Sequence, residues 1–314
     1  MSEIKTVATR VAYGETLVEL GKKRDDFIVL DADLAAATQT GKFKKEFPDR
    51  FYDCGIAEQN MVSIAAGIAA TGKKVFCSTF AMFAAGRAFE QVRNSIGYPH
   101  LNVIIGATHA GISVGEDGAT HQCNEDIALM RTIPGMTIIN PADAVETKLA
   151  MEAAMEHDGP VYLRFGRLPV PIVFDENYKF EIGKGVELKG GNDVTIVATG
   201  LMVGEALMAH DLLKERGISA RVINISTIKP LDEEIIIKAA KETGAIVTAE
   251  EHTVIGGLGS AVSECVAEVY PIPVVKLGIY DVFGHSGPAA KLLDQFGLRA
   301  ENIVEKALKA INLK

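Results

Sequence analysis

The sequence predicts an α/β protein of two domains, each an open, mostly parallel sheet between two layers of helices (a three-layer αβα arrangement). Its 314 residues suffice for two buried cores, at roughly 150 residues per domain. Short apolar runs alternate with longer helical patterns, which is typical of parallel strands covered by helices on both faces. The alternation breaks once, at 169–192, and then resumes.

Before the break, five apolar runs predict strands. Several are apolar on both faces, as burial between two helix layers requires. The runs are Phe27–Asp31, Val75–Ser78, Val103–Ala107, Met136–Asn140 and Val161–Phe165. Helices are expected near 5–22, 55–70, 82–97 and 142–157. Together these elements predict a first domain, 1–168.

The segment 169–192 predicts a linker, because it holds two prolines, a charged stretch and a Gly-Gly pair. A second domain, 193–314, follows from the alternation that resumes after it. Its expected strands are Val194–Ala198, Ala220–Ile225, Ala245–Ala249 and Pro273–Gly278. Its expected helices lie near 202–216, 232–243, 258–269 and 300–312.

Composition argues against several classes of protein. Asp plus Glu total 41 against 32 for Lys plus Arg, a net charge of −9, whereas nucleic-acid binding needs a basic face. No apolar run reaches about 18 residues, so no membrane span is predicted, and no signal peptide is recognisable. The four cysteines are scattered without a CxxC pair. We therefore expect a reducing, cytoplasmic location.

The first segment that carries chemistry is Asp53-Cys54-Gly55-Ile56-Ala57-Glu58, followed by a helix with almost no charged face. Such a helix should be buried, with Glu58 in its first turn. The carboxylate can simply favour the positive end of the helix dipole. It can also be a functional group, since a buried carboxylate with no cation nearby in sequence must be paired or protonated.

Two further segments follow predicted strands. Phe80 and Phe83 share one helical face, a spacing that is more typical of core than of a site. The loop 108–122 holds two histidines, two carboxylates and three glycines beyond a strand's carboxyl end, where open α/β sheets bind ligands. Metal binding is one interpretation, but the spacing matches no familiar zinc pattern. Close approach of the backbone to a small ligand is the favoured one.

These segments, GIAEQNM, STFAMF and HAGISVGEDGATHQ, resemble in order and spacing the pyrimidine-binding domain of transketolase. VATRVAYG and DADLA fit the opening of that domain. EEHTVIGGLGSAVSE and GIYDVFGHSGPAAKLLDQFGL resemble the family's C-terminal domain. The family's diphosphate-binding domain, with its GDG motif for magnesium, is not found. The resemblance therefore implies the C-terminal subunit of a split transketolase, with a separate N-terminal subunit that holds the diphosphate and Mg²⁺.

The resemblance assigns the cofactor contacts. Glu58 matches the glutamate that hydrogen-bonds N1′ of the aminopyrimidine of thiamine diphosphate and favours its imino form. Phe80 and Phe83 match the aromatic pocket for that ring. A third aromatic is expected at Gly86, so Phe89 is expected to complete the pocket. Asp33 matches an aspartate near the cofactor at the subunit interface.

The resemblance also assigns the sugar contacts. Asp117 and His121 match groups that bind hydroxyls of the donor sugar. His109, Arg10 and Arg167 match the anchors of the substrate phosphate, for which a guanidinium fork is suited. Arg164 is the alternative to Arg167. A serine expected among the anchors is Ala37 here, so Thr38 is expected to replace it. The catalytic candidates are Glu58, His109, Asp117 and His121.

The function implied is transfer of a two-carbon ketol unit from a ketose phosphate to an aldose phosphate, with pentose-phosphate sugars as the default. Activity would require the partner, in a heterotetramer with two of each subunit. One alternative is a subunit of an enzyme like 1-deoxyxylulose-5-phosphate synthase, which usually has Arg where this chain has His109. The others are a 2-oxo acid dehydrogenase subunit and a non-catalytic assembly subunit.

Overall fold

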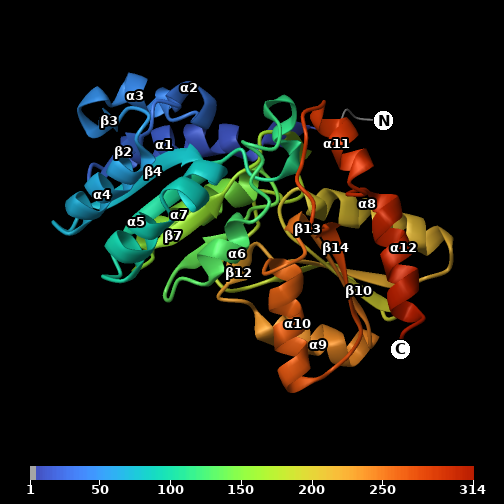
Figure 1. Ribbon diagram of the computed structural model, residues 1–314. Coiled ribbons are helices and arrows are strands. Elements are labelled where there is room, and N and C mark those ends of the chain that lie inside the picture. Colours follow the sequence, from blue (N-terminus) through green and yellow to red (C-terminus); the bar gives the residue numbers. More distant parts are fainter. Residues whose placement is uncertain (1–4) are drawn as a thin grey trace.

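A computed structural model describes residues 5–314, which form two sheets, each flanked by helices (Figure 1). The predicted α/β class with two mostly parallel, three-layer units is confirmed. The larger sheet has seven strands in the order β12-β6-β7-β5-β4-β2-β3, and the smaller has five in the order β14-β13-β10-β11-β9. A separate antiparallel pair joins β1 (Thr6–Ala8) to β8 (Pro169–Pro171).

The seven-stranded sheet is parallel except for its edge strand β12. Its strands are β2 (Phe27–Asp31), β3 (Phe51–Asp53), β4 (Lys74–Phe80), β5 (Val103–Thr108), β6 (Thr137–Ile139), β7 (Val161–Arg164) and β12 (Thr227–Lys229). Its helical segments are α1 (Thr9–Lys23), α2 (Ala35–Thr38), α3 (Gly41–Glu46), η1 (Pro48–Arg50), α4 (Glu58–Ala69), η2 (Phe83–Arg87), α5 (Phe89–Gln91), η3 (Val92–Gly97), η4 (Ile112–Asp117), α6 (Asp126–Arg131) and α7 (Ala144–Glu156).

Two apolar cores on opposite faces make this unit three-layered. On one face, Leu17 of α1 and Met151 of α7 pack against Phe27 of the sheet. On the other face, Met61 of α4 packs in a cluster with Ile105 of β5. Burial on both faces explains why the central strands lack polar alternation in the sequence.

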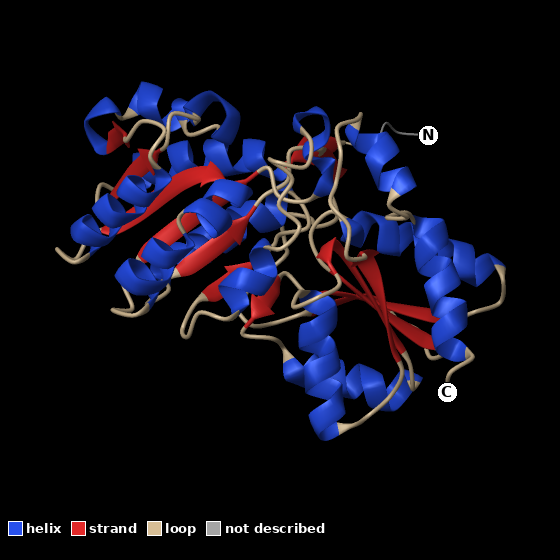
Figure 2. Cartoon of the chain, in the orientation of Figure 1, coloured by secondary structure: helices blue, strands red, loops and turns tan. Residues whose placement is uncertain are grey.

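The five-stranded sheet repeats this arrangement with an antiparallel edge strand, β9. Its strands are β9 (Val186–Lys189), β10 (Val194–Ala198), β11 (Ala220–Asn224), β13 (Ile246–Thr253) and β14 (Val274–Ile279). The remaining helices are α8 (Met202–Glu215), α9 (Glu233–Thr243), α10 (Leu258–Val269), α11 (Ala289–Gln295) and α12 (Ala300–Ile311). Figure 2 shows its helices on both sides of the strands, with α9 and α10 opposite α8 and α12.

The segment 169–192 is more structured than a plain linker, because β8 and β9 lie within it. In addition, β12 belongs to the second half of the sequence but pairs with β6 of the first sheet. The two halves are therefore joined by an edge strand as well as by the crossing segment, and the predicted boundaries at 168 and 193 stay a prediction. Among the described residues, no helix is long and apolar enough to cross a membrane.

The predicted helix near 82–97 is three short segments, two of them of π type. The expectation that helix 55–70 is buried all round is wrong. The face of α4 that carries Ser63, Ile64 and Gly67 is exposed, and an added Cβ at Gly67 would meet nothing within 4 Å. The exposed residues of α4 are uncharged, and Gln59 and Asn60 are among them, so the lack of charge in this helix does not indicate burial.

Candidate active site

The candidate residues gather beyond the carboxyl ends of the parallel strands. Phe80 closes β4, His109 directly follows β5, and Arg167 lies three residues beyond β7. Glu58 begins α4, after the loop that leaves β3. Because parallel strands end at one edge of the sheet, residues distant in sequence meet there, as expected for a ligand site in an open α/β sheet.

Four aromatic rings form the centre of this site. Phe80 and Phe83 are nearly parallel, with centroids 5.8 Å apart and an interplanar angle of 14°. His109 stacks on Phe80 at 3.9 Å. His121 and Phe83 form a T-shaped pair, with ring centroids 5.4 Å apart and an interplanar angle of 73°. The fold thus brings the predicted aromatic pair together with both predicted histidines.

Glu58 is buried, with only 1% of its side chain exposed, and it has a cationic partner. Arg87 Nη1 donates to Glu58 Oε2 at 2.8 Å. The Arg87 guanidinium also lies over the Phe83 ring, 4.4 Å from its centroid. The sequence indicated no cation near Glu58, because Arg87 is 29 positions away and only the fold of 83–87 brings it back.

His109 is uncharged at neutral pH. Burial, and then the charges of Arg10, Arg167 and His121, lower its pKa to about 3. Its Nδ1 lies 2.9 Å from Thr108 Oγ1, and its backbone has a φ of +56°, which turns the ring back over Phe80. An imidazole in this state can donate or accept one hydrogen bond, but it adds no positive charge for an anion.

The positive charge comes from Arg10 and Arg167, which line one cleft of about 700 Å³. Burial and then the like charge of Arg167 lower the pKa of Arg10. Arg10 Nη1 donates to the Ala37 carbonyl at 2.7 Å, while its buried Nε has no hydrogen-bond partner within residues 5–314. Arg167 pairs with Glu116 at 3.0 Å. Two guanidinium groups with spare donors fit an anionic ligand.

Arg164, the alternative anchor, points away from the cleft. It is 3% exposed, and its Nε donates to Asp126 Oδ2 at 2.8 Å. Its Nη2 donates to the Glu251 carbonyl at 3.0 Å. Arg164 therefore links the first sheet to the second half of the chain, and of the two arginines Arg167 is the one available to a ligand.

Three other predicted site residues, Thr38, Phe89 and Asp33, lie outside the aromatic cluster and the arginine cleft. Thr38 is fully buried and donates to Asp31 Oδ2 at 2.7 Å, so the structure does not support it as a replacement anchor. Phe89 packs against the core around α4 rather than beside the Phe80–Phe83 pair. Asp33 is exposed at the end of β2, with a φ of +61° and its N–H donating to Asp53 Oδ1.

Asp117 lies exposed on the turn η4, whose position depends on residues that the sequence did not single out. Glu251 of β13 accepts a hydrogen bond from the Ser113 N–H at 2.6 Å. The Gln122 amide donates to the carbonyls of Ile112, Gly115 and His285. The second half of the chain thus holds the loop that carries Asp117 and His121.

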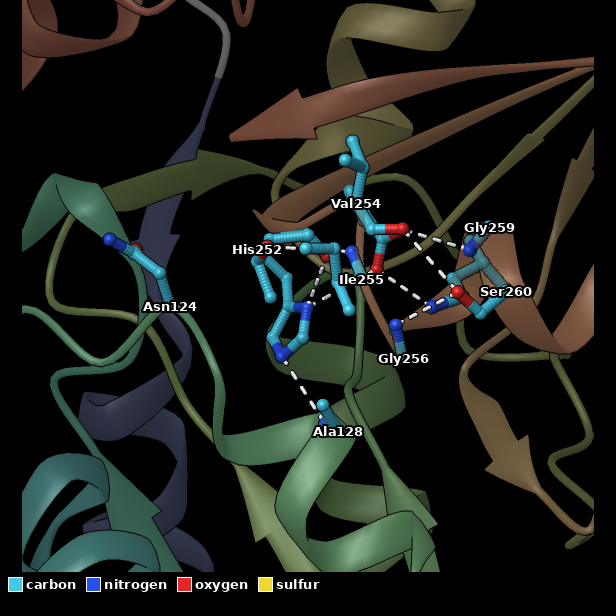
Figure 3. Close-up of polar contacts among 12 residues, drawn as sticks. Asn124, Ala128, His252, Val254, Ile255, Gly256, Gly259 and Ser260 are labelled. Atoms are coloured by element: carbon cyan, nitrogen blue, oxygen red, sulfur yellow. Dashed lines mark hydrogen bonds and ion pairs between the residues drawn. The ribbon is translucent and has the colours of Figure 1, made fainter. Parts of the chain in front are cut away.

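Figure 3 shows a second contact between β13 and the first half of the chain, at α6. His252 Nε2 accepts from the Ala128 N–H at 3.3 Å, and Nδ1 lies 2.7 Å from the Thr253 carbonyl. Burial lowers the pKa of His252 to about 4, so the neutral ring can accept at one nitrogen and donate at the other. This arrangement is structural, because both ring nitrogens are occupied by the backbone.

The group at the strand ends fits an aminopyrimidine. The ring needs an aromatic face and a carboxylate at its edge, which Phe83 and Glu58 offer. The two side chains lie close together, because the Arg87 guanidinium contacts both of them. Within residues 5–314, no cluster of three or more His, Cys, Asp or Glu side chains is arranged to hold a metal ion.

The chain belongs to the transketolase family. The family model for the transketolase pyrimidine-binding domain matches residues 5–172, and that for the transketolase C-terminal domain matches residues 183–303. A Methanocaldococcus jannaschii protein whose name describes a transketolase C-terminal section is 53% identical over 303 residues, 96% of this chain and 95% of that protein.

Two other relatives carry the word subunit in their names. The 6-deoxy-6-sulfo-D-fructose transketolase subunit of Clostridium sp. (strain MSTE9) is 45% identical, over 95% of this chain and 92% of that protein. An apulose-4-phosphate transketolase subunit of Phocaeicola vulgatus is 41% identical, over 97% and 98%. A solved structure described as a split gene transketolase, inactive beta4 tetramer, matches with a TM-score of 0.91 and 52% identity, covering 99% of this chain and 100% of that one.

Proposed function

We propose that this chain is the C-terminal subunit of a thiamine-diphosphate-dependent transketolase, which moves a two-carbon ketol unit from a ketose phosphate to an aldose phosphate. The observation that carries the proposal is the buried carboxylate of Glu58 beside the Phe80–Phe83 pair, at the carboxyl edge of a parallel sheet. In the transketolase family, a glutamate and an aromatic pair in this arrangement bind the aminopyrimidine ring of the cofactor. When bound, the cofactor supplies the carbanion that carries the two-carbon unit.

Glu58 has two tasks in this proposal. Its carboxyl group binds N1′ of the ring, and by sharing a proton there it favours the imino form at the opposite amino group. Phe83 offers its face to the ring, while His121 and His109 border the space where the sugar lies. Burial of Glu58 strengthens these hydrogen bonds because competing water is excluded.

The sugar's anionic end is assigned to Arg10 and Arg167, with His109 as a neutral hydrogen-bonding neighbour. Asp117 and His121, on the loop held by Glu251 and Gln122, are assigned to the sugar hydroxyls. Two relatives are named for a sulfo-sugar and a sugar phosphate. An anionic sugar is thus the proposed substrate class, and no particular sugar pair is proposed.

The proposal includes a separate subunit that binds the diphosphate and Mg²⁺, in a heterotetramer with two of each subunit. It is supported by relatives named as subunits and by the solved split gene transketolase, whose beta4 form is described as inactive. The open face of α4 offers a surface for association. A cytoplasmic location is proposed because all four cysteines are free.

The test is Glu58→Gln, assembled with the diphosphate-binding subunit. Gln keeps the shape but cannot share a proton, so kcat should fall at least 10²-fold, the scale of a positioned acid–base group. Glu90→Gln, an exposed glutamate on α5, is the matched control and should leave kcat unchanged. A Glu58→Gln enzyme within threefold of the wild type would refute the proposed role.

A second measurement tests the division of labour between subunits. Calorimetry should show weak binding of thiamine diphosphate by this chain alone, because the diphosphate and Mg²⁺ ligands belong to the partner. Tight, Mg²⁺-dependent binding by the isolated chain would contradict the two-subunit proposal.

A further inference from the structure

Arg87 contacts both side chains that are assigned to the aminopyrimidine, Glu58 and Phe83. Its Nη1 donates to Glu58 Oε2 at 2.8 Å, and its guanidinium lies 4.4 Å above the centroid of Phe83. A guanidinium and an aminopyrimidine protonated at N1′ share three properties: each is planar, each stacks on an aromatic face, and each donates N–H groups to a carboxylate. The ring and the guanidinium cannot lie on the same face of Phe83 at once.

We propose that the Arg87 guanidinium holds the place of the cofactor's aminopyrimidine in the cofactor-free chain and swings out when the cofactor binds. This inference rests on the proposed function, since it takes Glu58 and Phe83 as the pyrimidine contacts. It assigns Arg87 a role of its own, that of a competitor for the cofactor's place.

The pairing has a clear physical reason. Glu58 is almost fully buried, and a buried carboxylate that loses its cation is strongly destabilising. In the folded chain Arg87 satisfies that charge before any cofactor arrives. The guanidinium resembles the protonated aminopyrimidine in shape and charge, so it keeps Glu58 and Phe83 in position. These two side chains therefore need little rearrangement when the cofactor binds.

Arg87 is also placed so that it can leave. It is the last residue of η2, its side chain is 47% exposed, and it lines a cleft of about 610 Å³. The next residue, Ala88, has non-helical backbone angles, and the preceding Gly86 is exposed. Water can solvate the half-exposed guanidinium once it leaves, and the N–H groups of the bound ring then take its place beside the buried Glu58 carboxylate.

The experiment measures cofactor affinity rather than turnover. Thiamine diphosphate with Mg²⁺ is titrated calorimetrically into the chain assembled with its diphosphate-binding subunit. Arg87→Ala removes the competitor, so Kd should tighten by about tenfold, which corresponds to one lost charge-assisted contact in the free state. Arg93→Ala, an exposed arginine on the neighbouring η3, is the control and should leave Kd unchanged.

A small cation gives a second, independent readout. Millimolar methylguanidinium should refill the vacated place in the Arg87→Ala complex and weaken cofactor binding back toward the wild-type Kd. It should have no effect on the wild type. Failure of methylguanidinium to compete in the variant would overturn the proposal.

Arg87→Lys covers the case in which the alanine variant does not fold. Lysine keeps a cation for Glu58 but stacks poorly and is more strongly hydrated, so its Kd should lie between those of the wild type and the alanine variant. An unchanged or weaker Kd in both variants would mean that Arg87 does not compete with the ring. Failure of the wild-type complex to bind the cofactor at all would instead refute the proposed function.

Discussion

Arg164 and Arg167 are three positions apart but lie in opposite environments. Arg164 is buried against Asp126, whereas Arg167 faces the open cleft that it shares with Arg10. Removing one partner of a buried ion pair costs several kcal/mol, because the remaining charge is not solvated by water. A cleft arginine can be removed at little cost to the fold. The two positions therefore separate a binding role from a structural one.

Arg167→Ala should raise KM for a sugar phosphate by roughly 10- to 100-fold, because a charge-assisted contact with phosphate is worth about 1.5–3 kcal/mol. KM for glycolaldehyde, an acceptor without phosphate, should change little, since it never makes that contact. Steady-state kinetics with both acceptors checks this. Equal loss with both, in a variant that still assembles, would remove Arg167 from the anion site.

Arg164→Ala is the contrasting variant. It leaves Asp126 buried without its cation, so it should destabilise the fold by about 3–5 kcal/mol. Urea denaturation of the isolated chain measures this directly. A stable Arg164→Ala chain with a selective defect toward phosphorylated sugars would mean that the two arginines have been assigned the wrong way round.

For individual residues, whether a contact could be predicted from the sequence depends on how far apart the two residues lie along the chain. Phe80, His109 and Arg167 each follow a recognisable strand, so their meeting at one sheet edge could be predicted. The cation for Glu58 lies 29 positions away, and the carboxylate that holds Ser113 lies 138 positions away. Spacing carries no information about such contacts, because they arise from the fold as a whole.

At the scale of elements, the loop after β5 is shaped by what the second half of the chain packs against it. Gly111 has a φ of +83°, and an added Cβ there would collide with the Glu251 carboxyl group. Gly118 meets Ser286 in the same way, and α11 lies against η4. Figure 1 shows α11 beside this loop. The glycines therefore serve close packing as well as approach to a ligand.

Gly111→Ala should displace Glu251 from the Ser113 N–H and shift the turn that carries Asp117. We expect kcat/KM for the donor sugar to fall at least tenfold, since small misplacements of catalytic groups are costly. Kinetics of the assembled enzyme and thermal melting of the chain measure the two effects. Gly190→Ala, at an exposed position whose new Cβ would make only ordinary contact, is the matched control. Equal activity of the two variants would contradict the role of this packing.

The sequence predicted the strands of the sheet interior and missed several short strands outside it. Strands such as β2, β5 and β10 are apolar on both faces and are visible as continuous runs. The strands β8, β9 and β12 have three or four residues each, and β9 alternates between half-buried and exposed positions at a sheet edge. An alternating strand such as β9 buries little surface, and a strand of three residues such as β12 is too short for its pattern to be recognised.

At the scale of the whole molecule, a buried glutamate joins the two halves. Glu146 of α7 accepts hydrogen bonds from Tyr178 Oη and from Asn224 Nδ2, both at 2.8 Å. Tyr178 belongs to the segment that crosses between the sheets, and Asn224 ends β11. Burial raises the pKa of Glu146 to about 7. The contact between the halves therefore contains a carboxyl group that titrates near neutral pH.

The direction of the resulting pH dependence follows from linkage. In the unfolded chain a glutamate has a pKa of roughly 4.3. Between about pH 4.3 and pH 7, the folded chain keeps a proton on Glu146 that the unfolded chain has released. The contribution of Glu146 to the free energy of unfolding is therefore fully present below the lower pKa. It falls as the pH rises, until the pKa of the folded state is passed. At about 1.4 kcal/mol per pKa unit, the total between these two pKa values is on the order of 4 kcal/mol.

Glu146→Gln removes this titration, because an amide does not ionise. The variant should therefore gain on the wild type, by about 2–3 kcal/mol in the free energy of unfolding, as the pH is raised from 5 to 8. Urea denaturation of the isolated chain at several pH values measures the difference between variant and wild type, in which the contributions of all other titrating groups cancel. Glu152→Gln, at a more exposed position of the same helix, is the matched control for the loss of one carboxyl group. Parallel curves for Glu146→Gln and the wild type would mean that Glu146 stays ionised in the fold, and that Tyr178 and Asn224 compensate its charge fully.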